Sequence, residues 1–147
     1  MTQQRDSDFD AALAGVMGDL AREVDALHAH LIEERMVLDK ADAAALEAVG
    51  RAKSASLDRI DRLDTERRQL SDASGIDSLN DARWSHTVER LLECRRLNET
   101  NGRIVGQRMG QIRQALAVIS GDAPNGSTYG PDGAARIKLR SATLAQV

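Results

Sequence analysis

LLECRRLNETNGRIVGQRMGQIRQALAVI, residues 91–119, lies within the longest predicted helix of this 147-residue chain. Apolar residues recur in it every three or four positions, the spacing that puts them on one face of an α-helix. The pattern begins earlier and predicts one helix over residues 81–120. Its seam, which includes two asparagines, consists of Trp84, Val88, Leu91, Cys94, Asn98, Asn101, Val105, Ile112, Leu116 and Ile119, with Met109 beside it.

A similar pattern near the start of the chain predicts a first helix over residues 7–38. Leucine, valine and methionine recur at helical spacing from Leu13 to Leu38. Ser7 precedes this run, with an acidic residue three positions later, and is therefore expected to be the N-cap.

A second helix is expected over residues 42–70. Either Asp39 or Asp42, in the short polar break before it, could cap its first turn. Lys53 and Arg67 fall on its seam where apolar residues would be expected. The middle of this helix is therefore expected to pack loosely or to lie partly open.

A polar linker, residues 71–80, separates the second and third helices. Gly75 is the expected helix stop, and Asn80 or Asp81 the next N-cap. The chain has only three aromatic residues, and both of its prolines lie in the last 24 residues, so nothing earlier has to break a helix. The predicted fold is all-α, an antiparallel bundle of three long helices.

The composition changes after residue 120, where glycine and proline accumulate and helical periodicity stops. Residues 1–120 are therefore expected to form the bundle and residues 121–147 a flexible tail. Residues 134–147 could form a short final helix, although an isolated helix of this length is marginal in water.

Charge and hydropathy exclude several classes of protein. The chain has no long apolar run and no signal-peptide pattern at its start, so no membrane insertion and a cytoplasmic location are expected. The net charge is −7 over residues 1–50, zero over 51–100 and +4 over 101–147. Nucleic acid is not an expected partner, because the basic part is modest and lacks interleaved aromatic residues.

The residues suited to chemistry do not form a recognisable site. His28 and His30 are two positions apart on a helix and point to different sides, so they cannot share a metal ion. The single cysteine, Cys94, is expected to be a small apolar residue of the core. No nucleophile lies beside a histidine in a known pattern, and no phosphate-binding loop is present. We expect no enzymatic activity, no metal and no cofactor.

Asn98 and Asn101 on the third seam allow two interpretations. Buried amides can fix the register of a bundle. Alternatively, they mark the point beyond which the chain's own helices no longer cover the seam, which would leave an exposed groove-binding face. The residues of that candidate face are Val105, Met109, Ile112, Leu116 and Ile119.

Two other features of the third helix have alternatives. Gly102, Gly106 and Gly110 indicate either the close approach of another helix or a helix that must bend. Trp84 is expected to plug one end of the bundle, the alternative being a surface anchor for a partner. Tyr129, the only tyrosine, is a candidate recognition residue in the tail, although it could also fold back onto the bundle.

Three elements together resemble the FlgN family of flagellar export chaperones. They are Leu-x-x-Cys-Arg-x-Leu-Asn-x-x-Asn-Gly from residue 91, Arg-x-Ala-Leu-x-x-Ile-x-Gly from residue 113, and Tyr-Gly-x-x-Gly from residue 129. The family motif falls on Asn98, Asn101 and Gly102, and the tail motif on Tyr129, Gly130 and Gly133.

This resemblance implies a cytosolic chaperone without enzymatic activity that binds the C-terminal helices of the flagellar hook-filament junction proteins. Such a chaperone keeps its cargo unpolymerised and delivers it to the export gate, with the export ATPase as a further candidate partner. By similarity, the residues of the tail motif are the candidate contact with the gate. The alternative function is a structural helical-bundle protein that associates with copies of itself.

Overall fold

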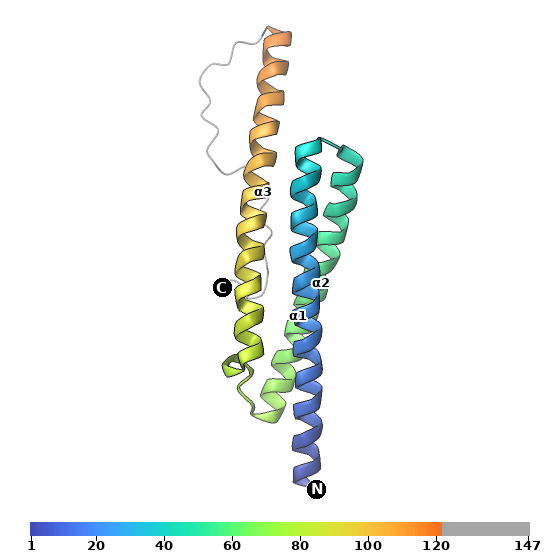
Figure 1. The fold of residues 1–147 in the computed structure, drawn as a ribbon, viewed down its shortest axis with the longest axis vertical. Coiled ribbons are helices and arrows are strands. Elements are labelled where there is room, and N and C mark those ends of the chain that lie inside the picture. The colour runs from blue at the N-terminus through green and yellow to red at the C-terminus, as the bar shows by residue number, and fades with distance from the viewer. Residues whose placement is uncertain (122–147) are drawn as a thin grey trace.

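The structure, a computed structural model, describes residues 1–121 and consists of long helices (Figure 1). Helix α1 spans Thr2–Lys40, α2 spans Ala43–Ser74 and α3 spans Ala82–Ser120, with a short 3-10 helix, η1, at Ser78–Asn80. Helix α2 runs back along α1, and α3 runs forward again beside it. Helix α1 packs against both of the others. The predicted all-α bundle of three long helices is confirmed, and the predicted tail lies outside the described residues.

Short polar side chains and glycines set the ends of the helices. The Asp42 side chain accepts a hydrogen bond from the backbone N–H of Ala45 at 3.0 Å and caps α2. Asp81 does the same for α3, with the N–H of Arg83 at 2.8 Å. Gly75 ends α2 at a φ of 71°, in the left-handed region that favours glycine. Asp42 and Asp81 are thus the caps, in preference to Asp39 and Asn80, and Gly75 is confirmed as the helix stop. The predicted end of the second helix at residue 70 is wrong, because α2 continues to Ser74, just before this glycine.

The start of α1 was predicted wrongly. The helix begins at Thr2, and Ser7 lies inside it instead of capping it. Residues 2–6 contain neither glycine nor proline, and most of them have ordinary helix propensities, so nothing in them stops the helix from continuing outward.

The core is built mainly from the apolar face of α1. Trp84 belongs to this core and closes it near the start of α3, as expected for a plug and not for a surface anchor. The buried cluster comprises Leu13, Val16, Met17, Leu20, Val24, Leu27, Leu31, Ile60, Trp84, Leu91 and Cys94.

Cys94 behaves as a small core residue. Its thiol is buried and donates a weak hydrogen bond to the carbonyl oxygen of Val24, at 3.8 Å. Burial raises the pKa of the thiol to about 11, so it stays neutral at pH 7. A neutral, enclosed thiol is a poor nucleophile, which fits a packing role.

The expected loose middle of α2 is wrong, because charged pairs fill its polar seam positions. Arg67 is only 3% exposed and donates to Asp64 Oδ1 through Nε at 3.0 Å and Nη2 at 2.8 Å. Its guanidinium also donates to Ser78 Oγ at 2.7 Å and lies 4.1 Å from the ring centroid of Trp84. This cluster joins α2 to η1 and α3.

The turn between α1 and α2 contains a strained residue. Ala41 has a φ of 55°, which a side chain disfavours and glycine tolerates. We expect Ala41→Gly to raise the free energy of unfolding by about 0.5–1 kcal/mol, after allowance for the greater freedom of glycine in the unfolded chain. Urea denaturation measures the change. Ala48→Gly, at an exposed position in the second turn of α2, is the control and should lower stability by about 1 kcal/mol. Equal losses for both variants would contradict the expectation.

Candidate binding surface

The apolar residues at the end of α3 lie open to solvent. We call Val105, Met109, Ile112, Leu116 and Ile119 the α3 stripe. All five are exposed, and the exposed fraction rises along the helix from 37% at Val105 to 82% at Ile119. Contiguous exposed apolar side chains on one helix face are typical of a site that binds a partner.

The second half of the α3 stripe is open because α3 extends beyond the turn that joins the other two helices (Figure 1). Helices α1 and α3 run in the same direction, and Asn101 contacts the backbone of Leu31. Lys40, the last residue of α1, follows Leu31 by nine positions. Since all α-helices rise by about 1.5 Å per residue, α1 ends near the level of Gly110. The rest of α3 projects past the bundle.

A polar layer joins the three helices just below the α3 stripe, and it consists of Glu34, Lys53, Asn98 and Asn101. Lys53 Nζ donates to Glu34 Oε1 at 2.7 Å and to Asn98 Oδ1 at 3.3 Å. Asn101 Nδ2 donates to Glu34 Oε2 at 2.8 Å and to the carbonyl oxygen of Leu31 at 2.9 Å. Helix α1 contributes the carboxylate, α2 the lysine and α3 the two amides. Because these groups bond only when the helices are correctly aligned, the layer fixes the relative register of the helices.

Both interpretations of the seam asparagines therefore fit the structure. Asn101 is 2% exposed and belongs to the register-fixing layer, while the seam beyond it is uncovered. Gly102 follows directly and is half-buried. Glu34 is a member of this layer that was not predicted, although its position three residues after Leu31 and four before Leu38 puts a charge on the seam of α1.

The glycine repeat does not interrupt α3, which stays helical through Gly102, Gly106 and Gly110. A Cβ atom added at Gly110 would meet no atom within 4 Å. The glycine at this position is therefore not explained by the close approach of another helix.

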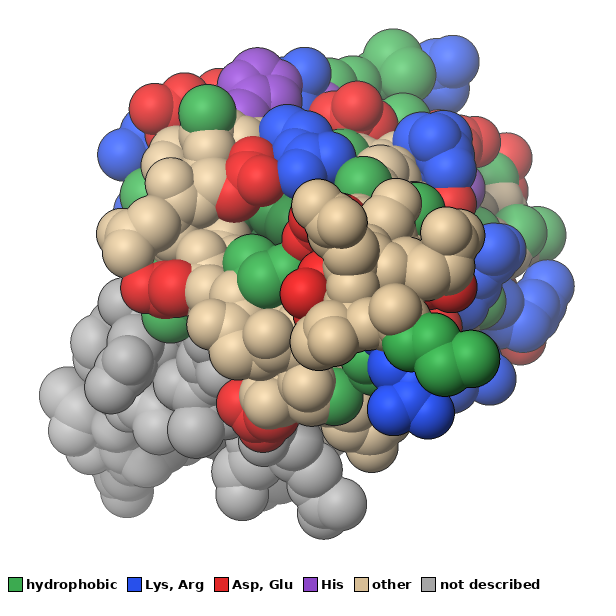
Figure 2. All heavy atoms as spheres, turned by 90° about the horizontal axis from the view of Figure 1, so that it is seen from below, with side chains coloured by type: hydrophobic (Ala, Val, Ile, Leu, Met, Phe, Trp, Pro, Cys, Tyr) green, Lys and Arg blue, Asp and Glu red, His purple; other side chains and the backbone are tan. Residues whose placement is uncertain are grey.

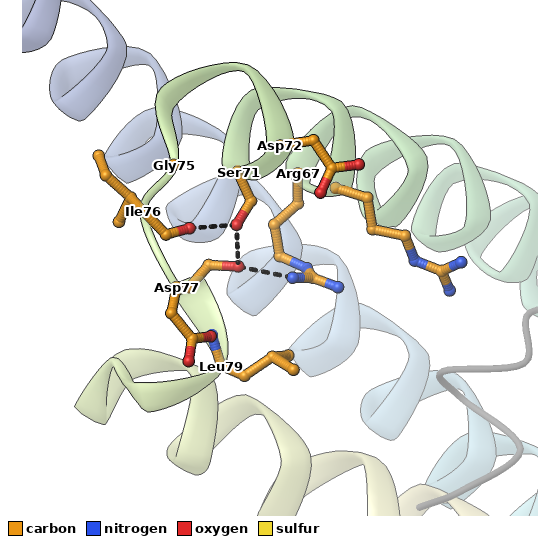
Figure 3. Close-up of a pocket in the computed structure, with 9 residues that line it drawn as sticks. Arg67, Ser71, Asp72, Gly75, Ile76, Asp77 and Leu79 are labelled. Carbon is orange, nitrogen blue, oxygen red and sulfur yellow. Dashed lines mark hydrogen bonds between the residues drawn. The ribbon is translucent and has the colours of Figure 1, made fainter.

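A hollow at the C-terminal end of α2 is lined by polar and apolar side chains, and several of its polar groups hydrogen-bond to one another (Figure 3). Arg67 donates to Ser78 Oγ, Ser78 Oγ contacts Ser71 Oγ at 3.3 Å, and the Ser71 hydroxyl donates to the carbonyl oxygen of Ile76. These contacts hold the linker against α2. The hollow is thus part of the α2–η1 connection.

The described residues include no cluster suited to a metal ion. Within residues 1–121, no group of three or more histidine, cysteine or carboxylate side chains could hold one. His28 Nε2 lies 3.4 Å from Glu93 Oε2, as one member of a surface pair. None of the helices in this range combines the length and apolar character needed to cross a membrane.

Tyr129, Gly130 and Gly133 lie outside the described residues. A model of the family described as FlgN protein matches residues 9–137, which include most of α1, all of α2 and α3, and the tail motif. Comparisons with curated proteins and with solved structures gave no match. Because this match covers most of its length, the chain belongs to the FlgN family of flagellar export chaperones.

Proposed function

We propose that this chaperone binds the C-terminal helices of flagellar hook-filament junction proteins along the α3 stripe. It acts in the cytoplasm, prevents the cargo from assembling early and delivers it to the export gate. Family membership supports a flagellar chaperone. The observation that carries the cargo proposal is the exposed apolar stripe of α3, which begins beside the end of α1 and continues onto the part of α3 beyond the bundle.

The α3 stripe has the dimensions of a helix-binding face. From Val105 to Ile119 it extends over 14 residue steps, or about 21 Å, which matches about four turns of a partner helix. An amphipathic partner helix binds such a face through apolar side chains at intervals of three and four residues. Met109 can adapt its shape to different apolar partners. A junction-protein helix docked here would have its own self-assembling face covered.

Co-purification tests the proposal directly. The full chain is mixed with tagged C-terminal fragments of junction proteins from the same organism, and any complex is sized by light scattering. A discrete complex with the chaperone is expected. A stable dimer of the chain that binds none of the fragments would contradict the proposal and would favour the self-associating structural bundle.

The tail motif, Tyr129, Gly130 and Gly133, is the proposed contact with the export gate, with the export ATPase as a further candidate partner. Tyrosines at interface hot spots often contribute about 2 kcal/mol or more, so we expect Tyr129→Ala to weaken binding to the gate protein about 30-fold. Affinity for cargo should not change. Thr128→Ala serves as the matched control, and the affinities are measured by calorimetry. Undiminished gate binding by Tyr129→Ala would reject this contact.

A further inference from the structure

The last part of α3, from the polar layer to the end of the helix, is basic. Residues 101–121 contain Arg103, Arg108 and Arg113 and no acidic residue. In the body of the bundle, arginines commonly contact carboxylates; Arg90, for example, bonds Asp25 at 3.0 Å and Glu93 at 2.9 Å. Within residues 1–121, no carboxylate lies within ion-pair distance of Arg103 or Arg108. The apolar stripe therefore lies in an excess of positive charge.

Two of these arginines border the α3 stripe. With about 100° of rotation per residue, Arg108 lies about 20° beyond Ile119 on one edge, and Arg113 lies about 40° beyond Met109 on the other. Arg103 lies on the opposite face of the helix. A helix docked on the stripe would thus have a guanidinium along each of its flanks.

The opposite end of the molecule has a different surface. Figure 2 views the bundle from the end at which α1 begins, and there acidic and basic side chains are interspersed while apolar side chains occupy small separate areas. The α3 stripe with its bordering arginines thus differs from the surface at this end of the molecule.

We infer that the occupant of the α3 stripe is an amphipathic helix whose apolar face is flanked by acidic residues. This inference rests on the proposed cargo-binding function and specifies the chemistry of the cargo. Carboxylates on both flanks would pair with Arg108 and Arg113 at the rim of the interface, where charge mainly selects the partner.

The same charges disfavour two other occupants. A second copy of the chain, docked stripe to stripe, would bring the same arginines against each other. Residues 134–147 of this chain contain three basic residues and no acidic one, so their positive charge would also be repelled by the arginines beside the stripe. A separate acidic helix is the occupant that the charge pattern favours.

Two synthetic helical peptides of about 16 residues provide the test. They share one leucine stripe and differ only in having glutamate or lysine at every flanking position. Anisotropy with the full chain should show about tenfold tighter binding of the glutamate peptide, since each exposed pair adds up to about 1 kcal/mol. The preference should shrink between about 50 and 300 mM salt, because rim charges are screened.

Charge-reversal variants link the preference to the arginines that border the α3 stripe. Arg108→Glu/Arg113→Glu is expected to invert it. Arg5→Glu/Arg62→Glu makes the same change in net charge at exposed positions elsewhere and should preserve it. If both peptides bind equally to the wild type and Val105→Asp/Ile112→Asp abolishes both, the inference is overturned while the proposed binding face stands. If neither peptide binds and the chain dimerises through the stripe, the inference and the proposed cargo-binding function are both overturned.

Discussion

A chain in which Val105 and Ile112 are both replaced by aspartate is expected to lose about 100-fold or more in affinity for junction-protein fragments. Both residues lie on the α3 stripe and are exposed in the free chain. Each loses an apolar contact worth about 1.5–3 kcal/mol on full burial, and each places a carboxylate in an apolar interface. Since about 1.4 kcal/mol corresponds to a tenfold change in affinity, a 100-fold loss is a conservative expectation.

Calorimetric titration with a purified fragment measures this loss, and circular dichroism verifies that the helices remain. The matched control is Gln107→Asp/Gln114→Asp, which adds the same charges to the same helix at exposed polar positions outside the stripe. It should retain wild-type affinity to within a few-fold. If a folded Val105→Asp/Ile112→Asp chain binds the fragment with wild-type affinity, the α3 stripe is not the cargo site.

Replacing Asp64 by asparagine is expected to lower the free energy of unfolding by about 3–5 kcal/mol, the usual effect of breaking a buried ion pair. Asp64 is 1% exposed and accepts from Arg67, while its other oxygen lies 2.7 Å from Arg68 Nη2. The substitution leaves the buried Arg67 guanidinium without its counter-charge. Domains of ordinary stability unfold with 5–15 kcal/mol, so this loss should be visible at once in a urea titration.

Two further variants separate the effect of removing a buried charge from the effect of placing asparagine in α2. Asp61→Asn makes the same chemical change at an exposed site one turn earlier and should cost little. Asp64→Leu/Arg67→Met removes both charges and should recover much of the lost stability, since apolar replacements of a buried pair are often neutral. An Asp64→Asn chain as stable as Asp61→Asn would show that the buried pair contributes nothing.

Much of the secondary structure could be predicted because its signals are local. Apolar spacing of three and four residues identified the helices, and Asp42, Asp81 and Gly75 were among the residues predicted to cap or stop them, although α2 runs four residues beyond its predicted end. Ser7 failed as a cap for a local reason as well, because a helix continues wherever no residue stops it. The candidate face was also visible in the sequence, as apolar residues that continue the seam beyond two asparagines.

The sequence by itself determined which residues form helices, where α2 and α3 start and which face of each helix is apolar. Only the tertiary structure decided which charges meet and how far α3 projects. Lys53 and Glu34 are 19 residues apart, and Leu31 and Asn101 are 70 apart, so their contacts depend on the register in which whole helices pack. That register places the end of α1 near Gly110 and leaves the α3 stripe exposed, because the burial of a side chain depends on its neighbours in space.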